Sequence, residues 1–229
     1  GWPLAQDLDV HARFENEGMR ARIDGGRVGR LALAGGEVEV VDWREGGMTA
    51  RLPVAGDLGE AFGLLQSSPL GPTLGDLFMG LSGRGPVQSE VVLYLPLKHM
   101  EDRAVTVVSR VQGAEVREAG VEEPLTDLGG AITVQNGAVF ARRLEGRFAG
   151  GAVGIAIDTP VATPARRLVT VEAAGRLEGG RLQRIAGLPV NAGLAGDTDW
   201  RGTMRVERSA ADENSRVTAR LESDLAGLT

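Results

Sequence analysis

The sequence predicts an all-β protein with mainly antiparallel strands, and two observations lead to this class. Apolar and polar residues alternate with period two in many short stretches, as in strands with one buried and one wet face. Paired glycines punctuate these stretches, and glycine adopts the positive φ that tight hairpin turns require. About twelve such strands fit the chain. We interpret as turns the pairs Gly25-Gly26, Gly35-Gly36, Gly46-Gly47, Gly129-Gly130, Gly150-Gly151 and Gly179-Gly180.

The first half of the chain contains three clear alternating stretches. Each places its apolar residues on one face, and in chain order these are Val10, Ala12 and Phe14; Val87, Val91, Leu93 and Leu95; and Val105, Val107 and Val111. A slip of one residue moves a whole set to the opposite face, so alternation alone leaves the inward side of each strand open.

Residues 57–82 interrupt this pattern and predict a short insert of two helices. Leu58, Phe62 and Leu65 recur at helical spacing, and Asp57 is a suitable N-cap. Pro69 ends the first helix and Pro72 opens a second, whose apolar residues are Leu74, Leu77, Phe78 and Leu81. We expect both helices to pack on the apolar face of the sheet and to plug or gate it.

The second half returns to strands. Its alternating apolar sets are Val153, Ile155 and Ile157; Trp200, Met204 and Val206; and Val217, Ala219 and Leu221. The predicted whole is one elongated, curled, taco-like sheet over residues 1–229 with an apolar groove. The chain begins at Gly1 rather than Met, so we expect a segment of a longer protein. Open edges are then expected at residues 10–14 and 217–221.

Composition excludes several function classes. The chain has 25 Lys+Arg against 31 Asp+Glu, and a net charge of −6 argues against nucleic-acid binding. The chain has no cysteine, which excludes thiol catalysis and zinc sites built from cysteines. Its only two histidines, His11 and His99, are far apart in sequence, which excludes a metal site built from several histidines. Dinucleotide, phosphate-loop and EF-hand motifs do not occur. We predict neither a cofactor nor a metal.

Hydrolysis is the least favoured alternative. Neither histidine lies in a G-x-S-x-G context. The neighbouring carboxylates, Asp197 and Asp199 or Glu122 and Glu123, resemble solvated turn residues more than a glycosidase pair. We therefore predict no catalytic residue and a non-enzymatic function.

Two short basic pairs, Arg142-Arg143 and Arg166-Arg167, have two interpretations. They belong to solvated faces of strands, or they contact anionic headgroups. The apolar faces of the strands are equally ambiguous. They close on one another as a sandwich core, or they form a groove that meets lipid.

Four segments, taken in order, carry a family resemblance. The first joins Leu64-Leu65 and Ser68-Pro69-Leu70 through residues 83–85 to a strand that ends in Leu95-Pro96-Leu97. The others are Gly129-Gly130 through Asn136-Gly137 to Gly150-Gly151 and Ile157; Gly196, Trp200 and Met204; and Ser223-Asp224-Leu225-Ala226-Gly227. Together they cover most of residues 56–229 and resemble the bacterial AsmA-like superfamily, most closely its large YhdP-type members.

The resemblance implies a long protein of the bacterial envelope, anchored in the inner membrane by a segment outside these residues. Its periplasmic part is a curled sheet with an apolar groove, and the family is associated with moving phospholipid towards the outer membrane. The implied partners are phospholipid, the membrane and neighbouring segments of the same chain. The alternative is a closed sandwich or a solenoid that binds a protein or glycan, or spaces other domains, without lipid.

On this interpretation the inward apolar residues line the groove. The expected lining is Val91, Leu93, Leu95, Val105, Val107, Val153, Ile155, Ile157, Trp200, Met204 and Val206. The expected gate or plug consists of Phe62, Leu65, Leu77 and Phe78.

Overall fold

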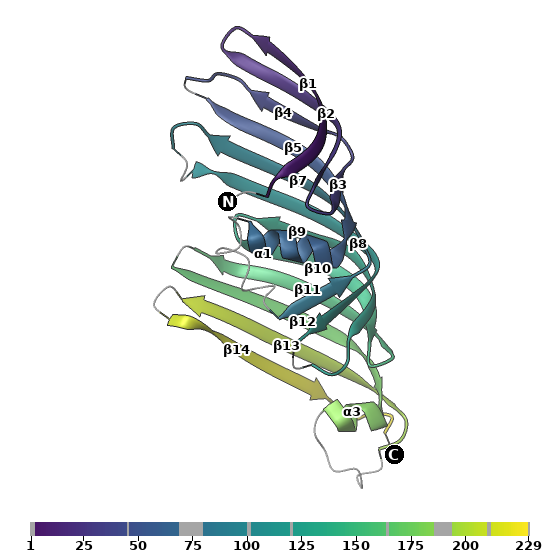
Figure 1. Cartoon of the computed structure of the whole chain (residues 1–229). Helices are drawn as coiled ribbons and strands as arrows, with labels where there is room; N and C mark the ends of the chain where they lie inside the picture. Colours follow the sequence, from purple (N-terminus) through teal and green to yellow (C-terminus); the bar gives the residue numbers. More distant parts are fainter. Residues whose placement is uncertain are drawn as a thin grey trace.

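A computed structural model describes residues 3–44, 46–68, 80–99, 102–119, 121–163, 165–185, 194–209 and 212–228. Their strands form one 14-stranded sheet that curls along its length (Figure 1). The predicted all-β, curled architecture is confirmed. The strands are β1 (Ala5–Glu15), β2 (Gly18–Val28), β3 (Leu31–Leu33), β4 (Gly36–Val40), β5 (Gly47–Asp57), β6 (Leu81–Arg84), β7 (Pro86–Pro96), β8 (Ala104–Glu118), β9 (Leu125–Gln135), β10 (Ala138–Phe148), β11 (Gly151–Ala162), β12 (Arg166–Glu178), β13 (Asp197–Ser209) and β14 (Asp212–Ser223).

The sheet is an antiparallel meander in the order β1-β2-β3-β5-β7-β8-β9-β10-β11-β12-β13-β14. The expected number of about twelve strands corresponds to these twelve positions. The two further strands are short and share positions, because β4 lies between β2 and β5 alongside β3, and β6 pairs with β8 alongside β7. At ~4.8 Å per strand, the sheet is roughly 50 Å across its strands.

Neither end of the sheet pairs back on the part of the chain that the structure describes. Within the described residues β1 pairs only with β2, and β14 only with β13. These strands contain the expected edges at residues 10–14 and 217–221. The described chain therefore forms an open sheet and not the closed barrel or sandwich that remained an alternative.

Two hairpins confirm the role of glycine in tight turns. Asn136 and Gly137 connect β9 to β10 with φ of 47° and 87°. Ala149 and Gly150 connect β10 to β11 with φ of 49° and 81°. Positive φ at both central residues is the conformation whose twist matches that of the flanking strands.

Three Gly-Gly pairs were wrongly interpreted as turns. Gly25-Gly26 lies inside β2, Gly129-Gly130 lies inside β9, and Gly179-Gly180 opens helix α3 (Gly179–Ile185). The strand glycines make room for a neighbouring strand's side chain. A Cβ on Gly130 would lie 2.8 Å from Leu144 Cδ2, at a site where the β9–β10 register shifts.

The expected first helix is confirmed as α1 (Leu58–Ser67). Asp57 caps it, since the Asp57 carboxylate accepts a hydrogen bond from the Gly59 N–H at 2.8 Å. The residues of the expected second helix, Leu77 and Phe78 included, lie outside the described residues apart from Leu81, which belongs to β6. Helix α3 was not predicted, because its seven residues span too few turns to show a helical period.

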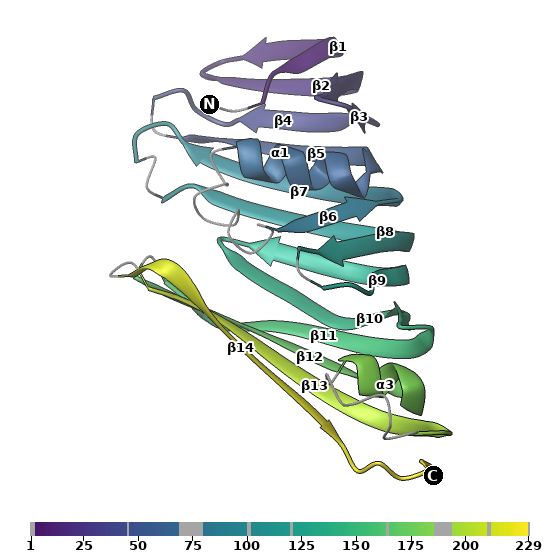
Figure 2. The same ribbon diagram turned by 60° about the horizontal axis from the view of Figure 1, so that its bottom comes forward.

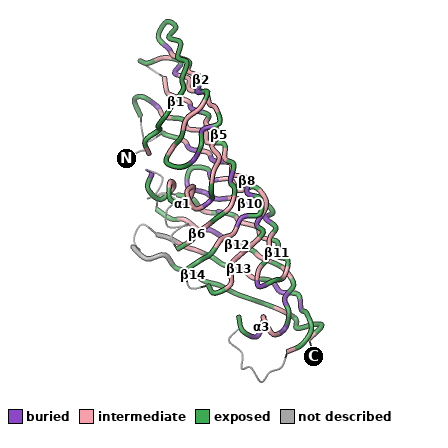
Figure 3. The backbone as a smooth tube through the Cα atoms, turned by 45° about the vertical axis from the view of Figure 1, so that its right-hand side comes forward, coloured by how far each residue is buried: buried purple, intermediate pink, exposed green. Residues whose placement is uncertain are grey.

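Helix α1 lies across one face of the sheet, on the inside of its curl, and we call this the inner face (Figures 1 and 2). Three clusters of buried apolar residues form the core on this face, and α1 packs on the two that span β7 to β11. Burial is concentrated in the middle strands, whereas β1 and residues 216–222 of β14 are exposed (Figure 3). The core therefore holds the centre of the sheet and leaves both ends open.

Candidate functional site

The strand register places all eleven expected lining residues on the inner face. Directly paired residues of antiparallel strands share a face. One row of pairs runs from Leu52 through Val91, Val107 and Val134 to Val139. A second row runs from Ala141 through Ile157, Val171 and Met204 to Ala219. The remaining lining residues flank these rows with the same parity, so the inner face is a continuous apolar surface across the sheet.

The lining residues differ in how far they are covered. Val105, Val107, Val153 and Trp200 are buried among protein side chains. Val91, Leu93, Leu95, Ile155, Ile157 and Val206 are partly exposed, and Met204 is 39% exposed. The buried four act as core in this conformation. The accessible part of the inner face therefore lies beside α1 and towards β13. A role in binding lipid stays a prediction for the whole set.

Helix α1 covers the centre of the inner face. Phe62 packs on the cluster formed by Leu58, Val87, Leu144 and their neighbours, and Leu65 packs on the cluster of Val105 and Val134. Few buried contacts attach the helix to the sheet, since Leu58 is its only buried residue. Phe62 and Leu65 thus lie where a plug would lie, and their role as a gate stays a prediction.

The N-terminus of α1 is fixed at the junction of β6 and β7. The Gly85 N–H donates to the Asp57 carboxylate, and the Leu58 N–H donates to the Gly85 carbonyl, each at 2.8 Å. A Cβ on Gly59 would lie 2.5 Å from the Gly83 carbonyl oxygen. Glycine at position 59 is therefore what allows the helix to approach β6 this closely.

Apolar side chains of the inner face remain exposed at both ends of the sheet. Val10 and Phe14 on β1 are 42% and 69% exposed. Val217 and Leu221 on β14 are 58% and 42% exposed. Exposed apolar patches of this kind mark interaction surfaces. The apolar surface thus reaches the unpaired edges instead of ending before them.

Three hydroxyl groups on the inner face bond to protein groups. The hydroxyls of Ser89 and Ser109, which face each other on β7 and β8, are 2.8 Å apart. The Thr159 hydroxyl accepts a hydrogen bond from the Val139 N–H and donates one to the Val139 carbonyl oxygen, each at 2.8 Å, just beyond the last β10–β11 pair, Ala141–Ile157. Because these hydroxyls satisfy each other or the backbone, they interrupt the apolar surface little.

Trp200 belongs to the third cluster of the core, together with Ala149, Val153 and Leu177. Its ring lies 6.0 Å from that of Phe148 at an angle of 54°, and Val153 and Leu177 pack beside it. A Cβ on its register partner, Gly175, would lie 3.2 Å from the Trp200 indole nitrogen. The glycine therefore makes space for the indole, whose buried N–H has no hydrogen-bond partner among the residues that the structure describes.

The two basic pairs have different environments. Arg142 and Arg143 are exposed, and Arg143 pairs with Glu145 at 2.6 Å. Arg166 pairs with Glu207 at 2.6 Å on the face opposite the inner face.

Arg167 shares the inner face with Val169, because residues two apart on a strand point to the same side. It is half-buried, and this burial lowers the pKa of Arg167. Sequence reasoning treated the four arginines alike, although the alternation through Val169 and Val171 already separates Arg167 from Arg166.

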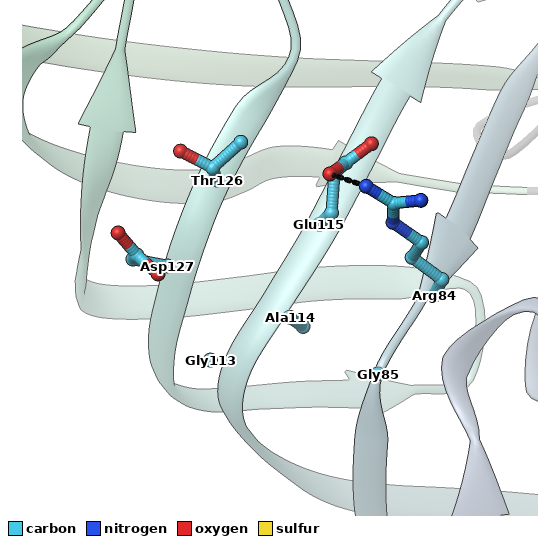
Figure 4. Close-up of a pocket in the computed structure, with 7 residues that line it drawn as sticks. All are labelled: Arg84, Gly85, Gly113, Ala114, Glu115, Thr126 and Asp127. Atoms are coloured by element: carbon cyan, nitrogen blue, oxygen red, sulfur yellow. Dashed lines mark hydrogen bonds and ion pairs between the residues drawn. The ribbon is translucent and has the colours of Figure 1, made fainter.

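A separate pocket of about 320 Å³ lies where β6, β8 and β9 meet (Figure 4). Its Glu115 side chain points away from the inner face, since Ala114 and Val116 on either side pack in the core. A hydrogen bond from Arg84, aided by Arg117, lowers the pKa of Glu115. The carboxylate is thus neutralised by protein groups, and we assign this pocket no ligand.

The remaining titratable candidates show no catalytic arrangement among the described residues. Asp197 lies 3.7 Å from Arg176, and Glu123 lies 3.1 Å from Arg181. One group, Asp9, His11 and Asp24, offers ligand atoms within 4.8 Å of one another, and all three residues are exposed. Asp24 already pairs with Arg22 at 2.7 Å, and this cation competes with a metal ion. We therefore assign no metal site.

Comparison with known proteins decides the family. The family model described as YhdP protein matches residues 1–229. The chain belongs to the YhdP family. This family is associated with the cell envelope and with lipid transport, and it is not known for enzymatic activity. No curated protein and no solved structure matches the chain. Among the described residues, no helix is long and apolar enough to cross a membrane.

Proposed function

We propose that this YhdP segment binds and conducts phospholipid by covering its acyl chains with the inner face. One observation carries the proposal: an apolar face that is continuous across an open sheet and still exposed at both ends, at Phe14 and at Val217. The outer face carries ion pairs such as Arg20–Glu39 and Arg166–Glu207, which suit contact with water. A surface of this kind needs no catalytic residue to act as a carrier.

The hydrophobic effect explains why an apolar surface helps a lipid to cross water. Each acyl CH₂ exposed to water costs roughly 0.8 kcal/mol, so a sixteen-carbon chain faces a barrier on the order of 12 kcal/mol in crossing water. A strip of apolar side chains lowers this barrier wherever it is continuous. The lipid moves along the strip across successive strands.

The sheet edges extend this proposal to the whole protein. The free backbone groups of β1 and β14 suit pairing with neighbouring segments of the same long chain, so that the apolar strip continues beyond this segment. The location that fits is the periplasm, with an inner-membrane anchor outside these residues and transport between the inner and outer membranes. Helix α1 is the proposed gate, since it is the element that covers the middle of the strip.

Native mass spectrometry of the protein purified from bacterial cells tests the proposal. We expect phospholipid to co-purify at about one molecule per chain, and addition of delipidating detergent to remove it reversibly. A protein that emerges free of lipid and takes up none from added phospholipid would instead be a spacer or a binding module for another class of partner.

A further inference from the structure

Arg166 and Arg167 are adjacent in sequence but lie in opposite environments. The Arg166 guanidinium bonds Glu207 through two nitrogens, at 2.6 and 2.8 Å, on the outer face. Arg167 points to the inner face, where its Nε is buried and has no hydrogen-bond partner among the described residues. Protein groups therefore neutralise the Arg166 guanidinium, whereas the Arg167 Nε has no such partner in the part of the chain that the structure describes.

The surroundings of Arg167 are apolar. Val169, two residues along the same strand and on the same face, is buried, and its register partner is Val206. Val206 in turn pairs with Val217 on the edge strand, and this side chain is 58% exposed. Three valines thus form a strip that runs from the core to the open edge, directly beside the arginine.

Arg167 thus brings a positive charge and a buried hydrogen-bond donor to one end of the apolar strip. A buried donor without an acceptor is costly, and such groups in native proteins generally have a reason.

We propose that Arg167 forms a headgroup site for the phosphate of an amphiphile whose acyl chains lie on the strip of Val169, Val206 and Val217. The planar guanidinium matches phosphate oxygens, and the partial burial of Arg167 strengthens a bond to an anion. This inference rests on the proposed function and adds the residue that binds the headgroup phosphate. It also gives the bound lipid a direction, with its phosphate towards the β11–β12 turn and its chains across the strands.

Matched lipids and matched variants test the site. Dioctanoyl phosphatidylglycerol and dioctanoylglycerol carry the same chains, and only the first carries a phosphate. We measure their affinities, below their micellar concentrations, for the wild type, Arg167→Gln and Arg166→Gln by native mass spectrometry and titration calorimetry. Each variant removes one positive charge, and the two positions differ in the face they occupy. Thermal unfolding of each variant confirms that it is folded.

We expect Arg167→Gln to weaken phosphatidylglycerol binding about tenfold and to leave dioctanoylglycerol binding unchanged. Arg166→Gln should change neither affinity. Equal losses for the two lipids, or equal effects of the two variants, would overturn the headgroup site while leaving the acyl-chain proposal intact. Failure of the wild type to bind dioctanoylglycerol and phosphatidylglycerol would overturn both.

A third arm separates a lipid headgroup from a free anion. Glycerol 3-phosphate and inorganic phosphate should compete with phosphatidylglycerol only weakly, because they gain nothing from the valine strip. If either binds the wild type as tightly as the lipid does, and Arg167→Gln abolishes that binding, the site recognises a soluble phosphate and the amphiphile assignment is wrong.

Discussion

At the scale of single residues, the proposed lipid binding depends on which face of the sheet a side chain occupies. Leu221 and Thr218 lie on the same edge strand and are both exposed, but Leu221 belongs to the inner face and Thr218 to the outer. We expect Leu221→Asp to weaken phospholipid binding about tenfold or more, because a carboxylate within an acyl-chain strip must be desolvated. Titration of both variants with short-chain phosphatidylglycerol measures the effect.

Thr218→Asp is the matched control, since it adds the same charge to the same strand. It should leave the affinity unchanged, and both variants should lose less than about 1 kcal/mol of stability because both sites are exposed. Similar losses of lipid affinity in the two variants would show that charge on β14, and not the inner face, governs binding.

Glu115 provides a prediction about pH. Because Arg84 and Arg117 lower its pKa in the folded state, the carboxylate stabilises the fold at pH values above the ordinary glutamate pKa, and this contribution is lost as the pH falls through the lowered value. The free energy of unfolding of the wild type should therefore fall more steeply than that of Glu115→Gln below about pH 4.5. Urea unfolding of both proteins at several pH values measures this; parallel curves would contradict it.

At the scale of elements, we predict opposite effects on α1 when the same substitution, glycine to alanine, is made at Gly63 and at Gly59. Gly63→Ala should stabilise the helix by about 1 kcal/mol, since a Cβ there meets nothing within 4 Å. Gly59→Ala also raises the helix propensity, but it places a Cβ 2.5 Å from the Gly83 carbonyl oxygen. We therefore expect Gly59→Ala to loosen α1 from the sheet, seen as faster hydrogen exchange of residues 58–67.

The same pair of variants tests α1 as a gate. A loosened helix should expose more of the inner face and increase the amount of bound phospholipid, and Gly63→Ala should decrease it. In the wild type, the amides of α1 should exchange faster than those of β8. Exchange as slow as that of β8, together with unchanged lipid uptake in both variants, would identify α1 as a fixed part of the core.

The elements also show how far the sequence could predict the structure. Alternation located β7, β8, β11 and β13 because each packs one face on a core, and helical spacing with Asp57 located α1. The bulges at Val111–Ala114 and Ala141–Leu144 could not be predicted. They depend on how glycines accommodate neighbouring strands, and this packing is not visible in the local sequence. The inner face of the candidate site was predictable, but its division into buried and accessible parts depends on where α1 lies.

At the scale of the whole molecule, the open edges predict association. Unpaired β1 and β14 offer backbone groups to a second copy, and a head-to-tail contact of this kind does not close. Sedimentation should show a mean mass that rises with concentration beyond that of a dimer. Arg216, Arg220 and Glu222 on β14 oppose stacking through their charge, so the rise should be larger at high salt. A mass that stays at the monomer or stops at the dimer would contradict open-ended pairing.

The most direct test of the central claim compares the two faces of one sheet in living cells. A photo-reactive amino acid is placed at inner-face positions Met204 and Leu221 and, in separate proteins, at their outer-face neighbours Arg205 and Arg220. After irradiation, the purified proteins are analysed for covalently attached phospholipid by mass spectrometry. We predict lipid adducts at 204 and 221 and none above background at 205 and 220. Adducts that are absent from all four positions, or equal on both faces, would contradict an inner face that carries lipid.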